Sequence, residues 1–416
     1  MGLQLCQLCE IAYFVTDKIP LENVLLTDYV TTDSLLPNKE GRCVAQNLPP
    51  QKCALTHYKC GDVLVANIRP YLKKIWFADR EGGASADVLV FRAKSGHSQE
   101  FLYALLLQDT FYDYVMKGKK GSKMPRGDRD QIMRYSIPKL SLAEEACIGN
   151  MILSFCTKVN VNRLINDNLE AMAKQLYDYW FVQFDFPNEE GKPYKSSGGA
   201  MVWNEKLKRE IPVGWSVKNL GQIATSYQQG LIRSNNQLST DSKYGYLKMG
   251  DLDGKGQYTL QGLTRTNATN EEVDLYSLHK GDFLINVRNS KEIVGKTCLI
   301  GYVERNTLYN HMLVRLDFKD VSTFYMNLLF NSEFMYKALD GLKQGTTTVI
   351  ALYQSDLYRL PILIPAPCVM ERFLKITDSI LDQKEIISHE IAELTKQRNE
   401  LLPLLMNGQA TVNYHL

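Results

Sequence analysis

The feature that most constrains the fold is a phrase that the sequence states twice. YKCGDVLVANIRPYLKK, residues 58–74, returns as LHKGDFLINVRNSKE, residues 278–292. Each copy has a Gly-Asp turn, an apolar run typical of a strand, and then an Asn and an Arg two residues apart. Weaker sequence similarities occur before and after this phrase, in the same order in both halves of the chain. This pattern predicts a tandem of two diverged half-repeats.

Two long stretches have the apolar spacing of amphipathic helices. The first runs from about Ser141 to Tyr179 and would be ~58 Å long at about 1.5 Å per residue. The second lies near the C-terminal end, where Pro403 is expected to stop it. Two such helices can bury their stripes against each other as an antiparallel coiled coil, and Asn162 and Asn166 fall where buried amides would fix its register.

Short β-type runs and short helical patterns precede each long helix, and a Pro-, Gly- and Ser-rich connection separates the halves. The expected fold class is therefore α+β, with two tandem α/β domains related by an internal repeat and separated by the two helices. The expected boundaries are domain one at 1–139, a central helix at 140–182, a linker at 183–210, domain two at 211–366, a C-terminal helix at 367–408 and a tail at 409–416.

Composition and the lack of targeting signals indicate a globular protein. Of 416 residues, 45% are hydrophobic and 23% are charged, which is ordinary for a chain with packed cores. No uncharged apolar run reaches the roughly 18 residues that a membrane span needs, and the first residues do not resemble a signal peptide. Nine scattered cysteines suit a reducing compartment. We expect a cytoplasmic protein without a membrane contact.

Motifs for catalysis and for metal binding are incomplete. Cys6 and Cys9 form a C-x-x-C, but no second such pair completes a tetrahedral zinc site. The segment from Ser290 to Thr297 lacks the first glycine of a Walker A loop, and no G-x-G-x-x-G or G-x-S-x-G occurs. The sequence therefore predicts no catalytic residue, no metal site and no cofactor bound by this chain.

A basic loop, VMKGKKGSKMPRGDRDQIMR at 115–134, stands out from a net charge of only +2. Its glycines at 118, 121 and 127 are expected to keep the backbone mobile and able to approach phosphates. The corresponding stretch at 341–359 offers amide and hydroxyl groups that suit base edges. The candidate DNA-binding residues are Asn67, Arg69, Lys73, Lys74, Lys117, Lys119, Lys120, Lys123 and Arg126 in the first half, and Arg288, Lys291, Lys343, Gln344, Thr346 and Thr347 in the second.

A plainer interpretation of the same residues stays open. A basic loop is often solvated surface, Asn67 and Asn286 could cap turns, and Arg69 and Arg288 could pair with nearby carboxylates.

Five stretches in this order resemble one known family. They are YVTTDSLLPNKEG at 29–41, GDVLVANIRP at 61–70, NLEAMAKQL at 168–176, IPVGW at 211–215 and LLPLLMNG at 401–408. Over nearly all 416 residues the chain resembles the specificity subunits of type I restriction-modification systems. The first half lacks the Pro-Val-Gly-Trp lead-in of the second, so its first strand is expected to be short.

The resemblance implies a non-catalytic subunit with two target-recognition domains, each binding one part of a split, asymmetric site in double-stranded DNA. It also implies two copies of a modification subunit that carries S-adenosylmethionine and methylates adenine, and a restriction or motor subunit that uses ATP and Mg. The long helices would dock the two modification subunits, and the restriction or motor subunit could then join the complex. The positions expected to serve subunit binding are Ile152, Phe155, Leu169, Met172, Leu176, Ile380, Ile387, Ile391, Leu394 and Leu401.

An alternative from another class is a coiled-coil adaptor whose globular domains bind proteins rather than DNA. It predicts partner capture without sequence-dependent retention on a duplex. A third alternative is that the chain is a self-sufficient methyltransferase. It would then have to transfer methyl groups without a partner subunit.

Overall fold

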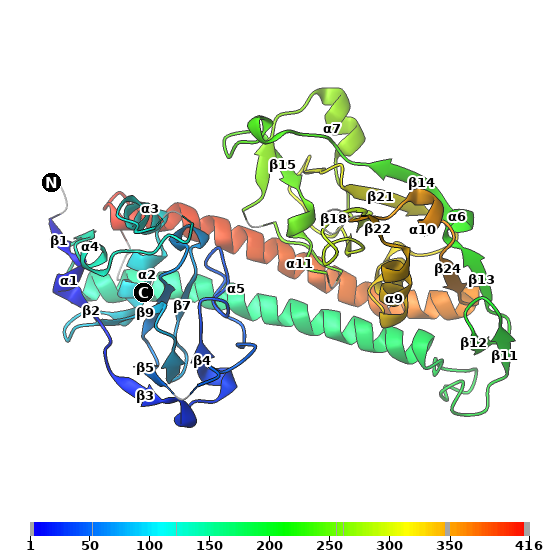
Figure 1. The fold of residues 1–416 in the computed structure, drawn as a ribbon, viewed down its shortest axis with the longest axis horizontal. Coiled ribbons are helices and arrows are strands. Elements are labelled where there is room, and N and C mark those ends of the chain that lie inside the picture. The colour runs from blue at the N-terminus through cyan, green and yellow to red at the C-terminus, as the bar shows by residue number, and fades with distance from the viewer. Residues whose placement is uncertain are drawn as a thin grey trace. The chain divides into compact units, whose positions relative to one another are not determined.

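The computed structural model describes residues 4–51, 53–121, 123–254, 256–260, 262–345 and 350–411. The chain forms two compact units. Unit 1 comprises residues 1–164 and 390–416, and unit 2 comprises residues 165–389. Both units combine helices with strands (Figure 1), as the expected α+β class requires. Among the described residues, no helix is long and apolar enough to cross a bilayer.

Unit 1 is built on two four-stranded sheets. Apolar residues fill their inner positions, and many of them are β-branched or small, which suits a buried pleated surface. The first sheet has the order β2 (Ala12–Phe14), β9 (Val88–Ala93), β6 (Val63–Ala66) and β7 (Ile75–Phe77). The second has the order β3 (Lys18–Pro20), β5 (Ala54–Tyr58), β8 (Gly82–Ala84) and β4 (Tyr29–Val30). The remaining elements are β1 (Leu5–Gln7), which pairs with β10 (Ser136–Pro138), and α1 (Leu8–Ile11), α2 (Gln99–Leu107), α3 (Asp109–Lys117) and α4 (Arg129–Met133).

Unit 2 also contains a four-stranded antiparallel sheet. Its order is β14 (Ala224–Gln229), β21 (Leu313–Phe318), β17 (Phe283–Asn286) and β19 (Thr297–Leu299). A three-stranded sheet has the order β16 (Thr264–Thr266), β15 (Tyr244–Leu247) and β20 (Leu308–Tyr309). Two strand pairs join β11 (Met201–Asn204) to β12 (Arg209–Pro212) and β13 (Ser216–Asn219) to β24 (Pro361–Ile364). The shorter helices are α6 (Leu220–Ile223), α7 (Asn270–Tyr276), α8 (Thr323–Phe330), α9 (Glu333–Leu342) and α10 (Gln354–Leu357).

Both long helices are present in the structure. Helix α5 spans Leu142–Tyr177 and continues into one π-helical turn at Asp178–Val182, and α11 spans Pro367–Met406. The expectation that Pro403 ends α11 was wrong, because the helix passes through it. Proline removes one backbone donor, and near a helix end few hydrogen bonds follow the one that is lost. The next turn still closes, since the Asn407 N–H donates to the Pro403 carbonyl at 3.0 Å.

Within each unit, polar side chains link the two long helices. In unit 1 the Asn162 amide donates to Glu390 at 2.9 Å, and the Asn162 side chain is 6% exposed. In unit 2 the Asn166 amide donates to Ser388 at 3.1 Å, and Lys384 is paired with Glu170. Buried polar pairs of this kind favour one register over neighbouring ones.

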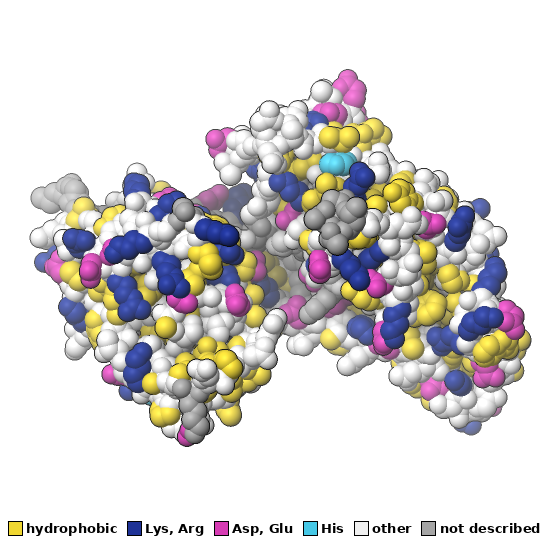
Figure 2. All heavy atoms as spheres, viewed as in Figure 1, with side chains coloured by type: hydrophobic (Ala, Val, Ile, Leu, Met, Phe, Trp, Pro, Cys, Tyr) yellow, Lys and Arg dark blue, Asp and Glu magenta, His cyan; other side chains and the backbone are white. Residues whose placement is uncertain are grey.

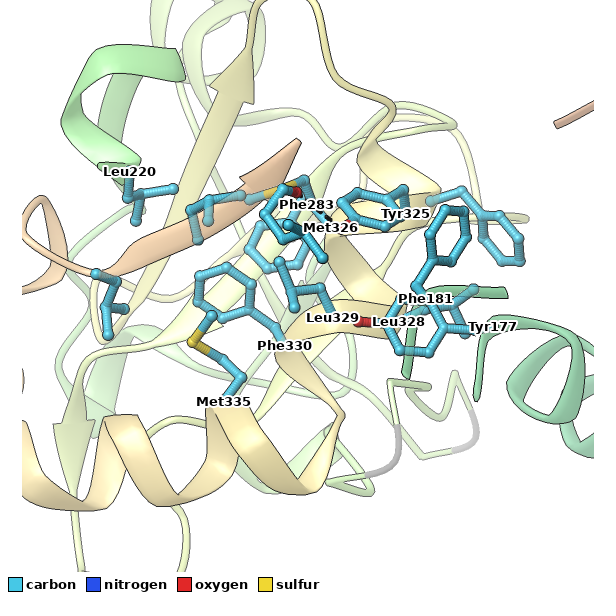
Figure 3. Close-up of a cluster of buried hydrophobic side chains, with 14 of the residues drawn as sticks. Tyr177, Phe181, Leu220, Phe283, Tyr325, Met326, Leu328, Leu329, Phe330 and Met335 are labelled. Carbon is cyan, nitrogen blue, oxygen red and sulfur yellow. Dashed lines mark hydrogen bonds between the residues drawn. The ribbon is translucent and has the colours of Figure 1, made fainter. Parts of the chain in front are cut away.

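An aromatic cluster forms the core of unit 2. Figure 3 shows Tyr177 and Phe181, from the C-terminal part of α5 and its π-helical turn, beside Tyr325 of α8. The Phe181 ring also meets Phe373 of α11, with centroids 4.7 Å apart. Unit 1 has its own core of β6, β9, α2 and α3, on which Ile148, Ile152 and Leu402 of the long helices pack. The long helices are therefore structural parts of both units.

The repeated Gly-Asp turn has the same construction in both units. Gly61 and Gly281 adopt φ of 89° and 91°, which favours glycine. Asp62 accepts from the Lys59 N–H at 2.7 Å and forms a two-pronged ion pair with Arg92 on β9, with both distances 2.7 Å. In unit 2, Asp282 accepts from the His279 N–H at 2.9 Å and pairs with Arg315 on β21 at 3.2 Å. The repeated aspartates thus fasten a turn to a neighbouring strand.

Candidate nucleic-acid interface

Two segments that lie far apart in the sequence are joined in unit 1. They are the strand-end segment, residues 67–74, and part of the basic loop at 115–134. The Arg69 N–H donates to the Pro125 carbonyl at 2.8 Å, and the Gly127 N–H donates to the Asn67 carbonyl at 3.3 Å. Lys120 and Arg126 exchange backbone hydrogen bonds of 2.9 and 3.0 Å across the loop. The strand-end segment and the basic loop therefore present one continuous surface.

Unit 2 repeats this construction. After β17 the chain forms β18 (Arg288–Asn289), which pairs with β23 (Ile350–Ala351), and β23 pairs in turn with β22 (Gln344–Gly345). The Leu352 N–H donates to the Val287 carbonyl at 2.8 Å. Thr346 and Thr347 of the predicted site lie outside the described residues. In this unit too, the strand end with its arginine is joined to the loop at 343–352.

A strained turn follows Arg69. The 3-10 helix η3 (Pro70–Leu72) lies between Arg69 and Lys73, which adopt left-handed φ values of 52° and 51°. Non-glycine residues in this region are held there only by their surroundings, and they cluster at functional sites. Here the surroundings are backbone hydrogen bonds of 2.9 Å from Asn38 to Leu72 and from Lys39 to Lys73.

Two of the predicted DNA-binding lysines support this turn from within the protein. The Lys73 ammonium lies 2.7 Å from Asp109 at the start of α3, and the Lys39 ammonium lies 2.8 Å from the same carboxylate. Burial alone would raise the pKa of Asp109, but hydrogen bonds from the two lysines outweigh it and hold that pKa below its ordinary value. Lys74 donates to the Thr32 carbonyl at 2.5 Å, and burial lowers its pKa. The ammonium groups of Lys73 and Lys74 are thus already bound to groups within the protein.

The other cations of unit 1 fall into two groups. Lys120 pairs with Asp128 at 2.5 Å, and Arg126 pairs with Asp87 at 3.1 Å. The second group is exposed, and none of its members makes an ion pair with a described residue: Arg69, Lys117, Lys119 and Lys123. Figure 2 shows Lys and Arg side chains gathered on the face of unit 1 around α3 and α4. This second group has charge to offer to phosphates.

In unit 2 the predicted residues also divide. Arg288 and Lys291 are exposed, and no ion pair to them is found among the described residues. The Lys343 side chain is only 6% exposed, because its ammonium lies 3.1 Å from Asp340 and donates to the Lys291 carbonyl at 2.9 Å. The Gln344 amide donates to Asp356 at 2.9 Å. Lys343 and Gln344 hold the loop in place, and Arg288 and Lys291 present the free charge.

The three glycines of the basic loop differ in their surroundings. A Cβ on Gly118 would lie 2.1 Å from Gln131, and one on Gly127 would lie 2.9 Å from the Asn67 side chain. At these two positions, side-chain atoms of neighbouring residues pack directly against the glycine backbone. Only Gly121 is exposed, with φ of 86°.

The plainer interpretation of the Asn-x-Arg pair holds only in part. The Asn286 side-chain oxygen accepts from the Arg288 N–H at 3.1 Å, which is a turn cap. The Asn67 side-chain oxygen is buried and has no hydrogen-bond partner among the described residues. Neither Arg69 nor Arg288 pairs with a described carboxylate.

Most predicted helix positions face the interior of their own unit. Ile152, Leu169 and Ile380 are buried in the two cores. Leu176, Ile387 and Leu401 pack against those cores, and Phe155, Ile391 and Leu394 are half-buried. Met172 alone of the ten is exposed, at 54%.

Other apolar residues of the helices are exposed and were missed from the sequence. In unit 1 they include Val161 and Leu164, at 47% and 63%, and in unit 2 Ile165, at 39%. Ile165 and Met172 are seven residues apart, so they lie on one face of α5. That second stripe was a signal available in the sequence. Tyr71 and Met124, which are 50% and 52% exposed, were also missed.

We also searched the described residues for side chains that could bind a metal ion or take part in catalysis. Among the described residues, no group of three or more His, Cys, Asp or Glu side chains is placed to hold a metal ion. In unit 2, burial and the nearby Arg288 lower the pKa of His311, whose Nδ1 is buried without a partner among the described residues.

Known proteins resemble this chain along most of its length. Residues 212–396 match the family model described as the type I restriction modification DNA specificity domain. The chain is 24% identical to the type I restriction enzyme MjaIX specificity subunit of Methanocaldococcus jannaschii, over 77% of this chain and 71% of that protein. It is 22% identical to the HindI specificity subunit of Haemophilus influenzae, over 92% of this chain and 94% of that protein. The solved S subunit of a type I system from M. genitalium aligns at 12% identity with a TM-score of 0.49, over 98% of this chain and 96% of that one.

Proposed function

The chain belongs to the specificity subunits of type I restriction-modification systems, and from this premise we propose that each of its compact units reads one part of a split, asymmetric site in double-stranded DNA. The chain would perform no catalysis itself. It would place a modification subunit over the adenines to be methylated.

One observation carries this proposal. In both units a strand that ends in Asn-x-Arg is joined by backbone hydrogen bonds to a loop that is distant in sequence. Each joined surface presents arginine and lysine side chains without a described acidic partner, namely Arg69, Lys119 and Lys123 in unit 1 and Arg288 and Lys291 in unit 2. Phosphate contacts from such residues fix a protein on the duplex, and loop side chains between them can read base edges.

The finer architecture is inferred on the same basis. We infer that the two units derive from one repeated domain, because β2-β9-β6-β7 and β14-β21-β17-β19 place the Gly-Asp strand third in each sheet. We infer also that α5 and α11 form an antiparallel coiled coil. The links from Asn162 to Glu390 in unit 1 and from Asn166 to Ser388 in unit 2 support it.

The partners follow from the family. We propose that two modification subunits bind the helices and bring S-adenosylmethionine, and that a restriction subunit brings ATP and Mg. The residues that bind them would be the exposed apolar ones, Val161 and Leu164 in unit 1 and Ile165 and Met172 in unit 2, rather than the buried stripe. Isolated apolar residues are common on surfaces, but a repeated set on one helix is typical of a binding face.

A charge removal tests the DNA surface. Changing Lys119 and Lys123 together to Ala should lower the slope of log K against log salt by up to about 2, because each lost phosphate contact removes about 0.9 from it. The measurement is a binding titration of a duplex by the complex with the modification subunit over a range of salt concentrations.

The matched control removes the same charge elsewhere in unit 1. Lys59→Ala with Lys139→Ala changes two exposed lysines outside the basic loop. If both double variants change the slope equally, the basic loop has no special role and the DNA surface is misplaced.

A second substitution tests the helix surface. Met172→Glu should weaken assembly with the modification subunit by about tenfold or more, because an apolar interface would then bury an unpaired charge. Sedimentation of the mixed subunits measures it. Gln175→Glu places the same charge at another exposed position of α5 and should assemble normally. Normal assembly of the Met172 variant would remove this position from the interface.

A further inference from the structure

We propose that Tyr71 contacts bases directly, its ring packing against one base step of the half-site that unit 1 reads. This inference rests on the proposed function and adds to it a non-ionic contact. None of the candidate DNA-binding residues found in the sequence is aromatic, and Tyr71 supplies one within the strand-end segment.

The Tyr71 ring is exposed to solvent. Tyr71 is 50% exposed, whereas Tyr58 and Tyr112 of the same unit are buried in its cores. No hydrogen bond or ring contact of the Tyr71 side chain with a described residue is found. The ring therefore does not stabilise unit 1 through such a contact. A large exposed ring has an amphipathic surface that suits a binding site.

The backbone around Tyr71 is tightly constrained. Tyr71 is the middle residue of η3, and the residues on either side of η3 are left-handed. Six hydrogen bonds or ion pairs fix this short turn. They are Arg69 to Pro125, Leu72 to Arg69, Lys73 to Pro70, Asn38 to Leu72, Lys39 to Lys73, and the Lys73 ammonium to Asp109. A side chain on so constrained a turn loses little backbone entropy when it binds, which favours specific contacts.

Positive charge lies close to Tyr71 in the chain. Arg69 is two residues before Tyr71, is exposed, and makes no ion pair with a described residue. Its N–H is bonded to Pro125, which follows the exposed Met124 in the basic loop. Phosphate contacts fix the orientation of a protein on a duplex. The protein surface between the contacting cations then faces a groove, where base edges are accessible. An apolar side chain in that position meets bases, and proteins use such residues to unstack a base step.

The contact belongs to one half of the recognised site. Aligning Asn67 with Asn286 places Ser290 of unit 2 where unit 1 has Tyr71. Ser290 cannot pack on a base in this way. At this position, therefore, only unit 1 offers an aromatic ring.

The experiment uses the complex of the full chain with its modification subunit and a duplex that carries the motif found by methylation sequencing. Tyr71→Ala should weaken binding to the motif by about tenfold to a hundredfold, as expected for one base–aromatic stack. Binding to a scrambled duplex and the salt slope should stay unchanged, since no phosphate contact is lost. Tyr71→Phe should bind like the original chain.

A second readout locates the contact. 2-Aminopurine is placed at one position after another in the half-site of unit 1, where its fluorescence rises if a neighbouring base unstacks. The original complex should give a rise at one step, and Tyr71→Ala should abolish it. Leu25→Ala, a change at an exposed apolar residue of unit 1 outside both DNA-binding segments, should leave affinity and fluorescence unchanged.

Three results would overturn the inference. They are an unaltered affinity for Tyr71→Ala, an equal loss for the Phe variant, or an equal loss on the scrambled duplex. Failure of the proposed function gives a different pattern, because the original complex would then not distinguish its motif from the scrambled duplex at all.

Discussion

Replacing Arg92 with methionine should destabilise unit 1 by about 3 kcal/mol, the lower end of the range for removing one partner of a buried ion pair. Asp62 is 1% exposed and would keep its negative charge with only the Lys59 N–H as a described hydrogen-bond donor. The Arg92 side chain is itself 16% exposed, so solvent screens the pair little. Native-state hydrogen exchange of peptides that cover β6 and β9 should become about a hundredfold faster.

Two further variants separate charge from packing. The double change Arg92→Met with Asp62→Leu should recover most of the loss, because an apolar pair of similar volume is often as stable as a buried ion pair. Arg315→Met should cost less than Arg92→Met, since Asp282 is 14% exposed and water can replace part of the lost interaction. Unchanged exchange in the Arg92 variant would show that the repeated Gly-Asp turn does not depend on its arginine.

Replacing Phe181 with alanine should destabilise unit 2 by about 3–5 kcal/mol. The ring is 2% exposed and its centroid lies 4.7 to 5.8 Å from those of Tyr325, Phe373 and Trp215. Its removal leaves a cavity that rigid aromatic neighbours cannot fill. Hydrogen exchange of peptides from α8 and β17 measures the effect, and Phe334→Ala, at a 40% exposed position of α9, is the control.

The same aromatic cluster limits which recognition domains can be exchanged between specificity subunits. A segment of residues 209–366 taken from another specificity subunit would have to pack on Trp180, Phe181 and Phe373 of the recipient, because these lie outside the exchanged segment but inside the unit 2 core. We expect exchanges to succeed between chains that share this aromatic cluster. If the hydrogen-exchange protection of α8 and β17 is unchanged in Phe181→Ala, the aromatic cluster does not restrict such exchanges.

The strands of the repeated phrase could be predicted because their signals are local. A Gly-Asp turn before Val63 and before Phe283 predicts a strand at each place, and β6 and β17 begin there. The long helices follow from apolar periodicity, and α5 and α11 are present. The family resemblance could also be seen in the sequence, through motifs such as IPVGW at 211–215. All but the first residue of this motif lies within the matched specificity domain, residues 212–396. The predicted domain boundaries and DNA-contact residues stay predictions.

The rest depends on contacts between distant residues. Nothing local shows that Arg69 will bond to Pro125, or that Asp109 will engage Lys39 and Lys73. A basic side chain looks the same in the sequence whether it faces solvent, as Lys119 does, or packs at 6% exposure, as Lys343 does. The close packing at Gly127 cannot be seen in the sequence for the same reason, because its neighbour Asn67 is 60 residues away in the chain.

We propose that this chain determines where its partner methylates, with each unit reading one part of the site. The most direct measurement is single-molecule sequencing of modified adenines in cells that express the modification subunit with the chain, without it, or with residues 209–366 exchanged. We expect methylation at one split motif only when the chain is present, and we expect the exchange to alter one half of that motif and leave the other unchanged. Methylation that does not depend on the chain, despite a stable complex with its partner, would contradict the account and favour an adaptor that binds proteins.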